Sequence, residues 1–238
     1  RRALILKDIR VFWRDTTQWG QSLVLFGLLA AYIINLRHFS QQLTNPFWVD
    51  LVSYLNLGAC SLNLATLTTR FVYPQFSLEG KRIWIVGMAP LGLRRVVTTK
   101  YWLATVCSLV ITTTLVWGSC HMLRLSFERT LFFTYSVFVM TLALNGLAMG
   151  LGVLYPNFRE DNPSKIVSGF GGTFCLVVSF LYIIASIAAL AFGAPWARAG
   201  TQSAWIIVLS LGAFVALSAL IGYLPLKLAL RKVATLEL

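Results

Sequence analysis

Six long apolar runs constrain this chain more than any other feature of its sequence. A helix needs about 20 mostly apolar residues to cross the hydrocarbon core of a membrane, and each run meets that length. The runs lack the apolar-polar alternation over about 10 residues that a membrane β-strand shows. With 58% hydrophobic and only 12% charged residues, the composition is far from that of a soluble domain. The sequence therefore predicts an all-α integral membrane protein with six transmembrane helices, at residues 18–36, 47–69, 101–123, 131–155, 166–192 and 204–226.

The basic residues indicate how these helices are oriented. All but four of the 20 Lys and Arg residues fall on one side of the predicted spans, and the exceptions are Arg37, Arg124, Arg129 and Arg198. Cytoplasmic loops carry an excess of Lys and Arg. We therefore expect a multi-pass protein of the cell inner (plasma) membrane with both termini in the cytoplasm. The net charge of +12 lies beside the spans, which favours anionic membrane lipids as contacts and disfavours nucleic acid.

No catalytic or metal-binding residues stand out in the sequence. Cys60, Cys107, Cys120 and Cys175 lie in apolar runs without CxxC spacing, and the two histidines are isolated. The sequence also lacks a GxxxxGK[ST] phosphate loop and an LSGGQ-like segment. These observations predict that the chain is not an enzyme and binds no cofactor itself.

Two segments are expected to lie outside the membrane core. Residues 1–17 place their apolar side chains roughly on one helical face, as in a helix that lies along the membrane surface. The basic loop at 70–100 contains a second amphipathic element, in which Ser77 is a candidate N-cap and Glu79 suits the first turn. A basic loop that only contacts lipid is the alternative for this second segment.

A shorter loop and a polar stripe are further candidates for function. Arg159, Glu160 and Asp161 lie between the fourth and fifth predicted spans, either in a solvated helix-capping turn or at a second cytoplasmic contact. Within the second span, Ser53, Asn56, Cys60 and Asn63 recur at spacings of three and four, so they share one helical face. This face either holds helices together or lines a translocation pathway.

Three segments, KDIRVFWRDTTQWGQSL, TRFVYPQFSLEGKRIWIVGMAPL and YPNFREDNPSKIVSGFGG, resemble bacterial ABC-2-type exporter permeases, the membrane subunits of ATP-binding-cassette transporters. The resemblance implies that residues 1–238 form a single transmembrane permease domain, similar to the C-terminal half of longer members. It also implies a coupling helix between spans two and three, at about 77–88, that docks on an ATPase. The coupling residues it implies are Ser77, Glu79, Lys81, Arg82 and Trp84.

The function implied by this resemblance is that of an export permease subunit working by alternating access. A separate P-loop ATPase subunit would bind ATP and Mg, and a second permease half would complete the pore. Three alternatives from other classes are a secondary transporter or channel, a membrane-bound enzyme, and a non-transporting membrane scaffold. The sequence favours none of these three, because the predicted spans carry no central acidic residue and the chain has no reactive cluster.

Overall fold

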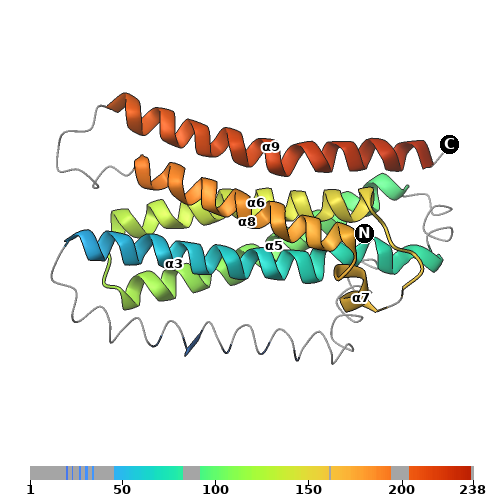
Figure 1. Cartoon of the computed structure of the whole chain (residues 1–238), viewed down its shortest axis with the longest axis horizontal. Helices are drawn as coiled ribbons and strands as arrows, with labels where there is room; N and C mark the ends of the chain where they lie inside the picture. The colour runs from blue at the N-terminus through green and yellow to red at the C-terminus, as the bar shows by residue number, and fades with distance from the viewer. Residues whose placement is uncertain are drawn as a thin grey trace.

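In this computed structural model, the chain folds into long helices that lie side by side (Figure 1). The structure describes residues 46–82, 92–160, 162–193 and 204–236, together with the isolated positions 20, 23, 27, 30, 31 and 34. These described residues are helical or irregular and include no β-strand. The elements are α3 (Pro46–Leu67), η1 (Thr68–Val72), η2 (Tyr73–Gln75), η3 (Ser77–Arg82), α5 (Leu93–Met122), α6 (Phe127–Leu154), α7 (Pro163–Val167), α8 (Phe170–Phe192) and α9 (Ala204–Leu236).

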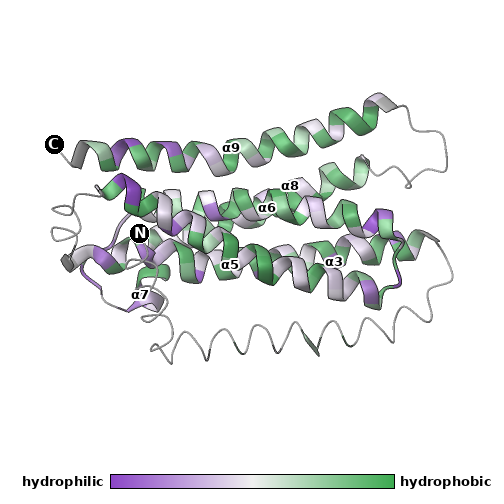
Figure 2. Cartoon of the chain, turned by 180° about the vertical axis from the view of Figure 1, so that it is seen from behind, coloured by the Kyte–Doolittle hydropathy of each residue, from purple (hydrophilic) through white to green (hydrophobic). Residues whose placement is uncertain are grey.

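Four of the described helices, α5, α6, α8 and α9, are long and apolar enough to cross a membrane. Hydrophobic residues cover most of their length, and hydrophilic residues gather near the ends of the bundle (Figure 2). The all-helical prediction is thus confirmed for the described residues, but six spans are not. α3 packs against α5, α6 and α8, but it is not among the helices that are long and apolar enough to cross a membrane. The expected surface helix at 1–17 and first span at 18–36 lie outside the continuous described ranges.

α6 is the central helix of the described bundle and contacts α3, α5, α8 and α9. Of its most apolar stretch 78% is buried, against 17% for α9, which lies at the periphery. Glycines allow α9 to approach α6 closely: a Cβ atom at Gly146 would lie 2.5 Å from the carbonyl oxygen of Gly222, and one at Gly150 would lie 2.5 Å from the carbonyl carbon of Pro225. Small residues at helix crossings are typical of membrane bundles.

Buried polar side chains connect the helices inside the bundle. Asn145 on α6 donates a hydrogen bond of 2.7 Å from Nδ2 to the Ser108 hydroxyl on α5. The hydroxyls of Tyr182 on α8 and Ser218 on α9 lie 2.7 Å apart. Polar groups in an apolar environment need such partners, and these bonds specify which helices are neighbours.

Two helix boundaries differ from the prediction. α5 begins at Leu93, after Gly92 with a positive φ of 66°, so one helix includes both the basic residues Arg94 and Arg95 and the expected third span. Asn162 and Pro163 start a separate short helix, α7, in which the Asn162 side chain accepts a hydrogen bond from the Ser164 backbone N–H. α8 starts only at Phe170, because Gly169 adopts an extended conformation with a ψ of 170°.

Candidate functional site

The candidate site is one end of the helix bundle, which we call the η3 end. It comprises η3, the start of α5, residues 154–160, α7 and the C-terminal part of α9. Residues far apart in the sequence meet there (Figure 1). It contains most of the described segments that were expected to lie outside the membrane.

A buried ion pair attaches η3 to α5. Lys100 Nζ donates to Glu79 Oε1 at 2.9 Å, and the two side chains are only 6% and 10% exposed. A pair so well removed from water interacts more strongly than one on the surface, but it also requires both partners to be present. Glu79 is therefore a positioning residue for η3 within this structure.

The segment after α6 packs on the other side of η3. The Ser77 hydroxyl accepts a hydrogen bond of 3.1 Å from the Asn157 backbone N–H. Gly80 lies directly against Phe158, since a Cβ atom there would overlap the Phe158 ring. The Phe76 and Phe158 rings also lie 6.0 Å apart, so η3 is held between α5 and residues 157–158.

η2, which precedes η3 in the chain, packs against α6 and the residue that follows it. The Tyr73 hydroxyl donates to the carbonyl oxygen of Tyr155 at 3.2 Å, and burial raises the pKa of Tyr73 to about 12. Gly152 on α6 lies against the Tyr73 backbone carbonyl. Lys232 of α9 donates to the carbonyl of Leu154 at 2.8 Å, which ties α9 to the end of α6.

The five residues predicted to couple to an ATPase have different positions. Ser77 and Glu79 are buried and bonded internally, so they do not form an open contact surface. Lys81 and Arg82 belong to η3, but their side chains lie outside the described part of the structure, as does the whole of Trp84. The exposed described side chain of η3 is Leu78, at 38%.

The second predicted contact lies next to η3. Arg159 is exposed, and Glu160 forms a 3.6 Å ion pair with Lys165 of α7. Asp161 lies outside the described residues. The structure thus brings Arg159 and Glu160 to the same end of the bundle as η3.

The polar stripe of α3 is buried between helices. Ser53, Asn56 and Asn63 are 2%, 3% and 8% exposed. Asn56 Nδ2 donates to the Ser119 hydroxyl of α5 at 2.8 Å. Its Oδ1 atom and the Asn63 Nδ2 atom have no hydrogen-bond partner within the described part of the chain.

Sequence reasoning did not detect a basic pocket at the η3 end. Arg94 of α5 and Tyr223, Lys227 and Arg231 of α9 are among its lining residues. The spacing of four between the three α9 residues places them on one helical face, which the sequence pattern could have indicated, but their proximity to Arg94 depends on the packing of α5 against α9. Within the described ranges, no group of His, Cys, Asp and Glu has the arrangement of a metal site.

The described helices and the η3 end define an all-helical protein with helices of membrane-spanning length. The whole chain, residues 1–238, matches the family described as "Putative ATP-binding cassette", and the chain belongs to this family. No curated protein and no solved structure matches the chain significantly.

This family match corrects the functional predictions made from the sequence. The identification as an ABC-2-type exporter permease is wrong, and so is the permease-subunit function, because the match is to an ATP-binding cassette family. The predictions that the chain is not an enzyme and binds no ATP or Mg are overturned by the same match. They relied on the missing phosphate loop, yet cationic side chains outside such a loop can also bind phosphate.

Proposed function

We propose that this chain is a membrane-embedded member of an ATP-binding cassette assembly, and that ATP is bound at the η3 end, in contact with a P-loop ATPase partner. The proposal takes ATP binding from the description of the family to which the chain belongs. It takes the membrane location from the four apolar helices. The observation that carries the choice of the η3 end is the buried Glu79–Lys100 pair, which fixes η3 to a membrane-length helix.

The charge distribution supports placing the η3 end in the cytoplasm. Arg94, Arg95, Lys165, Arg231 and Lys232 lie at this end, whereas the described basic residues at the opposite end are Arg124 and Arg129. An excess of Lys and Arg is typical of the cytoplasmic side. With this orientation, the C-terminal end of α9 also lies in the cytoplasm, in the inner (plasma) membrane setting proposed here.

ATP at this end needs positively charged groups near its phosphates. The sequence has no GxxxxGK[ST] segment, whose backbone N–H groups and lysine usually supply them. Arg and Lys side chains provide the alternative, through charge-assisted hydrogen bonds to phosphate oxygens. We therefore propose that a partner's P-loop and the basic residues of the η3 end act on the same nucleotide.

The partner's contact surface would be the exposed rim around η3. Leu78 and Phe158, 38% and 40% exposed, provide apolar contacts, and Arg159 provides a charge beside them. Ser77 and Glu79 hold this rim in place from beneath. A displacement of η3 by the partner would be passed to α5 through Lys100.

We also propose a second membrane-spanning chain as a partner. The mass of the intact complex, measured in mild detergent, tests whether this second chain is present.

A site-specific photocrosslinker tests the docking surface. We expect a crosslinker at Leu78, introduced into the full chain in its native membrane, to capture a protein with a P-loop that mass spectrometry identifies. The matched control is Phe127, which is 67% exposed at the opposite end of the bundle. Capture of the same ATPase from both positions, or from Phe127 alone, would contradict the proposal.

A further inference from the structure

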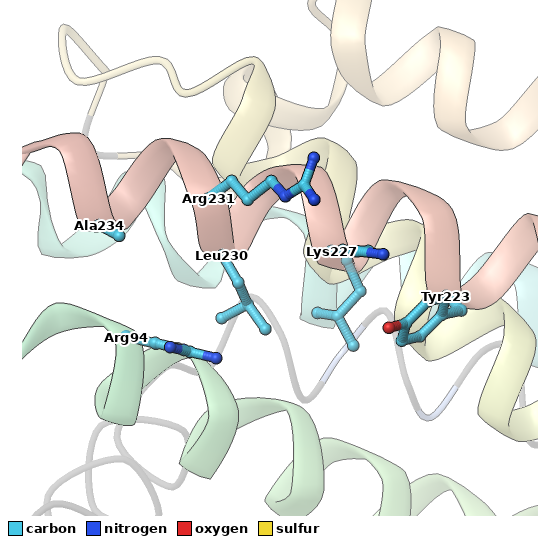
Figure 3. A pocket seen from close by; sticks show the side chains of 7 residues that line it. Arg94, Tyr223, Lys227, Leu230, Arg231 and Ala234 are labelled. Carbon is cyan, nitrogen blue, oxygen red and sulfur yellow. The ribbon is translucent and has the colours of Figure 1, made fainter.

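A pocket of about 350 Å³ lies between the first turn of α5 and the C-terminal part of α9. Ligand pockets in proteins typically range from about 300 to 1,000 Å³, so this volume suits a small group. Figure 3 shows the Arg94 side chain extending from α5 beneath α9, with Leu230 pointing down towards it and Tyr223 farther along α9. The pocket therefore combines a charged group from one helix with side chains from another.

The lining of the pocket is cationic. Arg94, Lys227 and Arg231 contribute three positive charges, and none of the described residues that line the pocket is acidic. Lys227 and Arg231 are four residues apart on one helix, where like charges destabilise each other. A bound anion would offset that repulsion.

Apolar and aromatic groups lie beside these charges. Leu226 and Leu230 line the pocket, and Lys227 Nζ lies 5.4 Å from the centre of the Tyr223 ring. This cation-aromatic contact holds the lysine along the surface of α9. The mixture suits an amphipathic ligand with a charged group at the cations and a less polar part against the leucines and the ring.

We propose that this pocket binds the phosphate of an anionic ligand, with Lys227 and Arg231 of α9 and Arg94 of α5 as the phosphate-binding residues. The guanidinium groups match phosphate oxygens with paired hydrogen bonds, and the lysine adds a point charge. Two sources carry this chemistry at the end of a membrane bundle: the headgroup of an anionic phospholipid and a free nucleotide phosphate. The inference does not rest on the proposed function, because a lipid headgroup would occupy the pocket without any ATP chemistry.

Two binding assays on the purified full chain in mild detergent distinguish these sources. In the first, native mass spectrometry measures retention of phosphatidylglycerol, with zwitterionic phosphatidylcholine as the comparison. In the second, radiolabelled ATP is titrated by equilibrium binding. Each assay compares the wild type with the double variant K227Q/R231Q and with R95Q, which removes one charge from an exposed residue of α5 that does not line the pocket.

We expect K227Q/R231Q to weaken binding of phosphatidylglycerol or of ATP by at least about tenfold, since each lost charge-assisted hydrogen bond is worth about that factor. The R95Q variant should bind like the wild type, and the charge-preserving variant R231K should retain most of the affinity. Loss in the lipid assay identifies a headgroup as the ligand, and loss in the ATP assay identifies a nucleotide. The proposal is overturned if the wild type binds neither ligand, or if K227Q/R231Q binds both as the wild type does.

Discussion

Lys100 on α5 and Glu79 on η3 form a 2.9 Å ion pair that is almost fully buried. The pair joins a short helix at one end of the bundle to a helix of membrane-spanning length. Because Ser77 also accepts a hydrogen bond from Asn157, η3 is tied to the segment on its other side as well. η3 and its neighbours therefore form a connected unit, through which a force on the surface of η3 reaches α5.

The first prediction concerns the ion pair itself. E79Q should lower the free energy of unfolding by about 3–5 kcal/mol, because it leaves the Lys100 ammonium buried without its counter-charge. Thermal unfolding of the purified protein in detergent measures this effect. The control is E160Q: its pair with Lys165 is largely exposed, so the change should stay within about 1 kcal/mol. Equal losses in the two variants would contradict the positioning role of Glu79.

The second prediction concerns the close packing of α6 against η2. G152A should destabilise the protein by about 1–3 kcal/mol, because its methyl group would overlap the carbonyl of Tyr73, a backbone group that cannot shift as readily as the end of a flexible side chain. G118A is the matched control, since a Cβ atom there meets nothing within 4 Å on α5. It should be neutral or stabilising by up to about 1 kcal/mol. A G152A protein as stable as G118A would show that α6 and η2 are farther apart than described.

A third prediction tests the polar contact between α5 and α6. S108A and N145A should each destabilise the bundle, and a double-mutant cycle should give a coupling energy of about 0.6 kcal/mol, typical of hydrogen bonds in membrane bundles. N145A should cost more than S108A, because both side chains also donate to a backbone carbonyl of their own helix but the fully buried Asn145 loses more packed atoms when it is truncated. Reversible unfolding in mixed micelles provides the four free energies. Strict additivity would contradict the 2.7 Å contact between the two side chains.

The fourth prediction is a pH dependence that originates at Tyr73. Burial raises its pKa from 10.0 to about 12, so the folded protein keeps a phenolic proton that the unfolded chain releases near pH 10. The stability tied to this proton is complete below pH 10 and declines as the pH rises towards 12. Y73F should remove that part of the decline, at a cost of about 0.5–1.5 kcal/mol at neutral pH for the lost hydrogen bond to Tyr155. Parallel pH profiles for wild type and Y73F would contradict this.

Apolar length predicted much of the helical architecture from the sequence. The expected spans at 131–155 and 204–226 correspond to α6 and α9, since runs this apolar have few alternatives to a buried or lipid-facing helix. The starts of helices were less predictable. α5 begins at Leu93, after an N-cap Gly92 with a positive φ and before the expected third span. The extended Gly169 separates α7 from α8. The positions of such breaks depend on the backbone conformation of single residues, and the hydropathy of the sequence does not predict that conformation.

The candidate site was predictable only in part. The sequence indicated that Ser77 and Glu79 belong to a distinct element, but their solvent exposure depends on partners 80 and 21 residues away, Asn157 and Lys100. The predicted N-cap role of Ser77 illustrates this, because its hydroxyl accepts a hydrogen bond from Asn157 across the fold. The pocket between α5 and α9 depends equally on tertiary contacts. Local sequence patterns carry no information on such pairings.

Photoaffinity labelling with azido-ATP tests the central claim most directly, using the intact assembly extracted from its native membrane. We predict that labelled peptides of this chain come from the described residues of the η3 end, namely 77–82, 92–100, 157–160, 162–165 and 223–236, and that excess unlabelled ATP abolishes the labelling. Absence of label on this chain, or label confined to the opposite end around residues 124–129, would contradict the account.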